Sequence, residues 1–161
     1  MQIQAIAAAT LLAASLSACM APPTRAQAGT QAPAQAGAQL TQINSPYSFS
    51  ETVQRVESTV LARGLSMIAK VDHSAGATSV GMSLRPTTVL IFGNPRGSTP
   101  MMQVQQTLAI DLPLKALVWT AEDGKVKVAV NAAELYQRHG LNADQTKVFG
   151  GVAALVEAAL K

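Results

Sequence analysis

The sequence predicts one domain that mixes α-helices and β-strands, and three segments carry this prediction. Apolar residues recur at helical spacing between Phe49 and Leu61. The run from Thr87 to Phe92 is β-branched and apolar, and Pro86 and Gly93 bound it, as is typical of a buried central strand. The last segment, from Val148 to Leu160, again shows one apolar stripe at helical spacing. The fold class expected from these elements is α+β.

Capping residues set the limits of the first helix. Ser48 and Glu51 have the spacing of a capping box, in which each side chain satisfies a free amide of the first turn. Gly64 suits the left-handed residue that ends many helices. The helix is therefore predicted over residues 49–63. A strand is expected over 65–71 and a short helical turn over 75–82.

The second half of the domain is predicted from its turns. Thr99 is expected to cap a short helix over 100–106, because Pro100 suits the first helical position. Asp123-Gly124 predicts a hairpin that joins strands at 115–120 and 125–131. One or two helical turns are expected over 131–138, followed by a terminal helix with a cap at Asn142.

The N-terminus indicates export. Residues 1–18 form an apolar segment of signal-peptide length, and Leu16-Ser17-Ala18-Cys19 has the small residues and the cysteine of a lipobox. Lipid attachment at Cys19 also accounts for the single cysteine of the chain. The expected location is the periplasmic side of the outer membrane, since Met20 and not an aspartate follows the cysteine. The segment before the apolar run has no Lys or Arg, and Ala26-Gln27-Ala28 offers an alternative cleavage that would give a soluble periplasmic protein.

Composition separates a linker from the folded part. Residues 19–39 begin with the lipidated Cys19 and are rich in Ala, Gln, Pro and Gly, so we expect a disordered tether. Residues 40–161 have the length of one domain. With a net charge of +3 and only 13% charged residues, the basic side chains are scattered and form no stripe. Nucleic-acid binding is therefore not expected.

Several segments in order along the domain carry a resemblance to a known family. The chain resembles the domain-of-unknown-function family numbered 302 (DUF302) through these residues: Ser45-Pro46-Tyr47-Ser48, Val71-Asp72-His73, Leu84-Arg85-Pro86-Thr87, Ile91-Phe92-Gly93-Asn94-Pro95, Thr99-Pro100-Met101-Met102, Ile110 to Trp119, and Arg138-His139-Gly140-Leu141. The resemblance implies a two-layer domain, an antiparallel sheet with helices on one face, in β-α-β(4)-α order like the TATA-binding-protein fold. It also implies a possible homodimer and brings no established activity.

The loop from Gly93 to Pro100 is the first candidate site. Its Asn94, Arg96, Ser98 and Thr99 stand beside a predicted helix N-terminus, where backbone amides and a guanidinium suit an anion or another small ligand. Turn geometry alone explains the same residues. Asp111 and Lys115 flank Pro113, which interrupts strand pairing, and we expect them at a cleft or a subunit edge. The favoured hypothesis is a non-catalytic, envelope-anchored module that binds a small ligand or a protein.

An enzyme is the alternative hypothesis. Asp72 and His73 together with Asp111 would supply acid–base or redox and metal-accessory chemistry, provided that the fold brings them together. The sequence has no paired metal-ligand spacing and no nucleophile motif, so no metal, cofactor or catalytic residue is expected. A purely structural role as a homo-oligomeric envelope protein is a third hypothesis.

Overall fold

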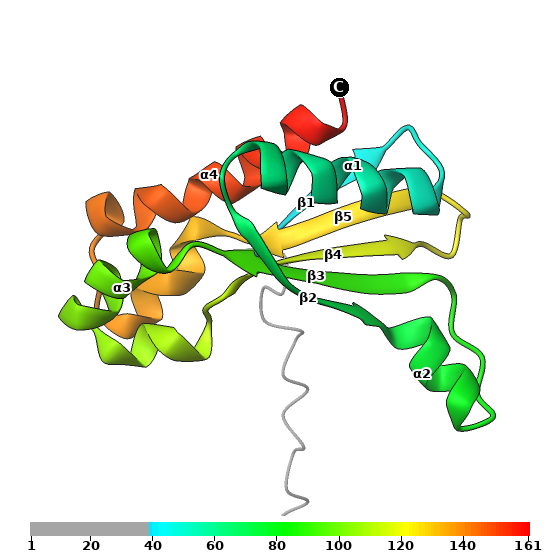
Figure 1. The fold of residues 1–161 in the computed structure, drawn as a ribbon, viewed down its shortest axis with the longest axis horizontal. Helices are drawn as coiled ribbons and strands as arrows, with labels where there is room; N and C mark the ends of the chain where they lie inside the picture. The colour runs from blue at the N-terminus through cyan, green and yellow to red at the C-terminus, as the bar shows by residue number, and fades with distance from the viewer. Residues whose placement is uncertain (1–38) are drawn as a thin grey trace, which may run out of the picture. The chain divides into compact units, whose positions relative to one another are not determined.

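A five-stranded antiparallel sheet with helices on one face forms the fold. The computed structural model describes residues 39–161, so the predicted signal peptide, the lipidation at Cys19 and the tether up to residue 38 lie outside the described residues. The strands lie in the order β1-β5-β4-β3-β2, and Figure 1 shows α1 and α4 side by side on one face of the sheet. The predicted α+β class and helix placement are confirmed.

The order of elements follows β-α-β(4)-α with short helices added in the connections. The strands are β1 (Leu40–Ser45), β2 (Ser66–Asp72), β3 (Thr87–Gly93), β4 (Leu114–Thr120) and β5 (Val126–Asn131). The helices are α1 (Phe49–Ala62), α2 (His73–Ser79), α3 (Pro95–Val104), α4 (Ala143–Ala159) and the 3-10 helices η2 (Gln106–Ile110) and η3 (Ala133–His139). Within residues 39–161, no helix has the length and hydropathy needed to cross a bilayer.

The caps of α1 and α4 form where the sequence places them, although Glu51 pairs with Arg55 at 3.0 Å in place of the predicted bond back to Ser48. The Ser48 hydroxyl accepts a hydrogen bond from the Glu51 amide at 3.3 Å and starts α1. At α4, Asn142 and Gln145 form a reciprocal capping box with two bonds of 2.9 Å. Gly140 has a φ of +80°, which a glycine adopts without steric cost, and ends η3.

Alternation along the central strands builds the core. Thr88, Leu90 and Phe92 of β3 are buried beneath α1 and α4, as are Ala116 and Val118 of β4. The residues between them, among them Val89, Leu117 and Trp119, point to the other face and are half-buried. Trp119 therefore lies on the face that these helices leave open.

The helix after β3 begins earlier than predicted. The Asn94 side chain accepts a hydrogen bond from the Arg96 amide at 2.9 Å, so Asn94, and not Thr99, is the cap of α3. Pro95 takes the first helical position and Pro100 lies inside the helix. Both Asn94-Pro95 and Thr99-Pro100 have a cap-proline pattern, and the structure uses the one nearer the strand.

We expect Leu90→Ala to destabilise the domain by about 2–5 kcal/mol, because it leaves a cavity at a fully buried position of the central strand. Val104→Ala is the control, since Val104 is 71% exposed on α3, and its effect should stay within about 0.5 kcal/mol. Denaturant unfolding of the two variants measures both values. Equal effects would contradict the assignment of the core.

Candidate functional site

An apolar pocket of about 410 Å³ lies where α3 and α4 meet the ends of β3 and β4. Its volume falls within the range of pockets that hold small molecules. The lining residues come from four parts of the chain: Leu65, Ile68, Phe92, Gly93, Asn94, Pro95, Gly97, Ser98, Met101, Met102, Ala109, Leu112, Pro113, Leu114, Val148, Phe149, Gly151, Val152 and Leu155. None of these side chains carries a charge.

Asn94 and Ser98 supply the polar side chains of the pocket, and both are already hydrogen-bonded. Asn94 caps α3 and also donates from Nδ2 to the Gly64 carbonyl at 3.4 Å. The Ser98 hydroxyl donates to the Asn94 carbonyl at 3.3 Å. These groups stabilise the helix start, so the pocket itself offers mainly apolar contact.

A buried ionic cluster lies behind the pocket wall. Asp111 follows η2, and both of its oxygens are paired: Oδ1 accepts from Arg138 Nη2, while Oδ2 accepts from Arg138 Nε at 2.9 Å and from His139 Nε2 at 2.5 Å. On the other side of the ring, His139 Nδ1 lies 2.9 Å from the Thr107 hydroxyl. The cluster ties η2 to η3.

The pKa of Asp111 reflects these contacts. Burial of the carboxylate raises its pKa, but the hydrogen bonds from His139 and Arg138 and the charges on both side chains outweigh this effect. The net result is a pKa below the ordinary value of 3.8. Asp111 is therefore an ionised structural acceptor near neutral pH, and it has no free oxygen with which to act as a base.

Neighbouring residues connect the cluster to the pocket. Leu112 and Pro113, directly after Asp111, line the pocket. Tyr136, two residues before Arg138, stacks on the pocket residue Phe149 with ring centroids 3.6 Å apart. The ionic cluster thus holds two walls of the pocket in place.

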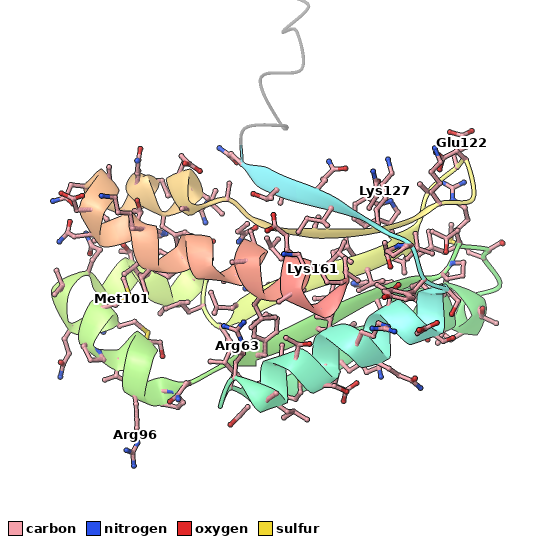
Figure 2. The ribbon with its side chains drawn as sticks, turned by 90° about the horizontal axis from the view of Figure 1, so that it is seen from above. Arg63, Arg96, Met101, Glu122, Lys127 and Lys161 are labelled. Atoms are coloured by element: carbon pink, nitrogen blue, oxygen red, sulfur yellow. The ribbon has the colours of Figure 1, made fainter. Side chains whose placement is uncertain are left out.

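The sequence-predicted ligand residues separate into three groups. Asn94 and Ser98 line the pocket, whereas Arg96 extends from α3 into solvent, as Figure 2 shows. Thr99 is exposed within α3 and is not among the lining residues. Asp111 and Lys115 lie together behind the wall, where Lys115 Nζ donates to the backbone carbonyls of Asp111 and Pro113, both at 3.0 Å.

The structure corrects the alternative acid–base site. Asp72 caps α2 by accepting from the Ala75 amide at 3.0 Å, and this hydrogen bond lowers the pKa of its exposed carboxyl. His73 begins α2 and is exposed. Figure 1 shows α2 at one end of the sheet and α3, beside which Asp111 packs through η2, at the other. Asp72 and His73 therefore do not converge with Asp111.

Arg138 and His139 are the site residues that sequence reasoning missed as partners of Asp111. They follow Asp111 by 27 and 28 positions, and only the fold brings them together. His139 lies in the last turn of η3, and its closest partner is the Asp111 carboxylate. In the part of the chain that the structure describes, no group of three or more His, Cys, Asp or Glu residues is placed to hold a metal ion.

The family assignment follows from the sequence match and agrees with this fold. The model for "Domain of unknown function DUF302" matches residues 41–159. The chain belongs to the DUF302 family. A crystal structure described as an uncharacterized conserved DUF302 protein from Bacillus stearothermophilus aligns with a TM-score of 0.65 at 15% identity, over 75% of this chain and 94% of that one. At this identity the likeness shows the fold.

Curated relatives of this DUF302 domain come from Brucella. The "Fluoride-specific ion channel FluC 1" of Brucella suis biovar 1 (strain 1330) is 43% identical over 103 residues, which are 63% of this chain and 41% of the relative. The protein of the same name from Brucella abortus biovar 1 (strain 9-941) matches at the same identity over 38% of its length. The chain thus spans about two fifths of the curated relatives that it matches.

We expect Asp111→Asn to lower the free energy of unfolding by about 1–3 kcal/mol at neutral pH, because Arg138 and His139 then lose a charged acceptor. The pKa of Asp111 is lowered on folding, so its stabilisation is complete well above 3.8 and is lost as pH falls through the lower folded value. Urea unfolding at pH 7 and at pH 3 should show the difference between variant and wild type shrinking in acid. Glu122→Gln, on an exposed turn, is the control and should show no such difference.

Proposed function

We propose that this DUF302 domain is a non-catalytic binding module that holds a small apolar molecule in the pocket between α3 and α4. The observation that carries the proposal is a cavity of about 410 Å³ whose lining has no charged side chain. Unfilled apolar surface of this kind favours an apolar guest, since transfer of the guest out of water is favourable in proportion to the area buried.

The polar groups at the pocket narrow the ligand class further. Asn94 and Ser98 already make hydrogen bonds within the protein, so a charged ligand group would be desolvated there without compensation. The side chain of Arg96 extends away and Lys115 is bonded to carbonyls on the far side of the wall. The part of the ligand that enters the pocket is therefore uncharged. The shape of the pocket then determines which apolar molecules fit.

The expected location fits such a module. The lipobox at Cys19 would anchor the domain to the cell envelope through a lipid, with the segment up to residue 39 as a tether. Apolar molecules concentrate in and near membranes, where an anchored domain meets them. The anchor and the periplasmic location belong to this proposal.

We expect Gly151→Leu to abolish ligand binding without unfolding the domain. Gly151 is exposed, but it lines the pocket together with Val148 and Leu155 of the same helix. A side chain added there meets no atom within 4 Å at its first carbon, so we expect a leucine to fit without a clash and to obstruct the pocket. Leucine also favours the helix over glycine. Titration with N-phenyl-1-naphthylamine, an uncharged apolar dye, should show binding at least about tenfold weaker than in the wild type.

Gly150→Leu is the matched control. Gly150 is the neighbouring residue of α4; like Gly151 it is exposed, but it does not line the pocket. Its replacement by leucine changes composition and helix propensity in the same way as the replacement of Gly151. Dye binding by this variant should equal that of the wild type. Equal loss in both variants, or no binding by the wild type, would refute the pocket as the site.

A second candidate function, favoured by the Brucella relatives, is to assist a membrane channel. Those relatives are named as fluoride channels, and this chain matches less than half of each. No helix in residues 39–161 is suited to cross a membrane, so we infer that the matched part of each relative is an accessory domain outside the bilayer and that the rest forms the channel. In this second function, the domain described here would act on a channel from outside the bilayer.

Deleting the matched 103 residues from the Brucella suis relative tests this second function. The shortened protein should still release fluoride from loaded proteoliposomes, because the channel lies in the remaining part. A change in the rate or regulation of release, restored by adding the domain in trans, would support an accessory role. Complete loss of transport, with the shortened protein still inserted, would show that the matched part belongs to the pore itself.

A further inference from the structure

We propose that the connection between β2 and β3, residues 73–86, is a membrane-docking arm that inserts its apolar tip into the surface of a lipid bilayer. No residue of α2 is buried. Beyond it, Val80 is 70% exposed, Met82 68% and Leu84 47%. Figure 1 shows α2 projecting from the end of the sheet, away from α1 and α4. The arm thus presents three apolar side chains, at alternate positions of the chain, that the domain does not cover.

The arm is held in a defined conformation. At its base, the Ser74 hydroxyl accepts from the Thr87 amide at 2.8 Å and donates to the Arg85 carbonyl at 3.3 Å. Arg85 Nε donates to the Thr120 carbonyl at 3.2 Å. At its tip, the Met82 amide donates to the Ala77 carbonyl at 2.9 Å. These bonds keep the apolar residues from folding back onto the domain, so exposure is their fixed state.

A positive φ at the tip supports this conformation. Gly81 has a φ of +73° and no atom within 4 Å of the place where a side chain would begin. Only glycine adopts this backbone without strain, and it turns the chain between Val80 and Met82. The side chains of Val80 and Met82 therefore flank a tight turn. In our proposal this turn is the part of the arm that enters the headgroup layer.

The charge of the arm fits an anionic membrane surface. Residues 73–86 contain no Asp or Glu, and Arg85 at the base follows the apolar Leu84 directly. The nearest carboxylate in the sequence, Asp72, precedes the arm and caps α2. Apolar side chains with a nearby cation bind the interface through burial of apolar area and attraction to anionic headgroups. A carboxylate at the tip would oppose both effects.

Two further observations select a bilayer as the occupant over a second copy of the chain. The Brucella relatives carry the matching segment in one chain with what their names describe as an ion channel. Here, an apolar segment and Cys19 precede the domain, with about twenty residues of linker before β1. Both observations favour a location of the domain beside a membrane. The inference therefore rests on the membrane location proposed above, but not on the ligand in the pocket.

A single tryptophan at the arm tests the contact. The chain has one tryptophan, so Trp119→Phe combined with Met82→Trp reports only from the tip. The protein, purified from its envelope with its N-terminal segment in place, is reconstituted into vesicles of phosphatidylcholine and phosphatidylglycerol that contain brominated lipid. We expect emission from position 82 to shift to the blue and to be quenched by the bromines. Trp119→Phe with Gln103→Trp, at an exposed position of α3, is the control and should show neither change.

A second pair of substitutions isolates the apolar tip. Val80→Glu added to the reporter should remove the quenching, whereas Val104→Glu, at an equally exposed valine of α3, should leave it unchanged. Unquenched emission at position 82 would overturn the proposal. A blue shift without vesicles that rises with protein concentration would replace the bilayer with a second copy. Dye binding in the pocket, measured on the same variants, separates failure of this inference from failure of the pocket proposal.

Discussion

A buried carboxylate is costly unless both of its oxygens are paired, and the pocket end of this domain is organised around that requirement at Asp111. Its side chain is only 10% exposed, and Arg138 and His139 donate to it from η3. The imidazole is buried as well, while the guanidinium is half-exposed and remains hydrated. This arrangement keeps the ion pair satisfied without burying every charge.

The position of Asp111 gives the ion pair its structural effect. It lies between η2 and β4, a connection whose residues Leu112 and Pro113 form one wall of the pocket. Its partners lie on η3, which carries Tyr136 and, through the ring stack, positions Phe149 of α4. Two segments that have no strand pairing with each other are thus tied together in a fixed arrangement.

The parts of the fold that sequence patterns predicted are those in which local preference and burial agree. The cap at Ser48, the run from Thr87 to Phe92 and the capping box at Asn142 each act within one element, so neighbouring residues are enough to identify them. The hairpin around Gly124, with a φ of +77°, is local in the same sense. The start of α3 was misplaced because two cap-proline pairs lie within seven residues, and the helix begins at the first of them, after Asn94.

The candidate site was harder to predict, because its parts are distant in the sequence. The loop at Asn94 and Ser98 does reach the pocket, where both side chains make hydrogen bonds at the start of α3. Most of the lining consists of ordinary Leu, Met, Val and Phe residues, whose pattern in the sequence is that of core residues. A polar motif can be recognised in the sequence from its residue types. An empty apolar pocket forms only when α3, α4 and the strand ends pack together, so no local sequence pattern indicates it. Arg138 and Asp111 likewise become a pair only in three dimensions.

The pocket and the arm lie at opposite ends of the strands, and this has a consequence for how they would work together. Phe92, at the end of β3, lines the pocket, while Thr87, at its start, is bonded to Ser74 of the arm. Five residue steps of strand separate them, which is roughly 17 Å. With the arm inserted and the strands running along the bilayer normal, the pocket would lie farther from the bilayer than the arm. An apolar ligand would then have to leave the bilayer to reach the pocket. This arrangement favours a domain that presents the ligand to a partner in the aqueous space, and not a domain that stores the ligand in the membrane.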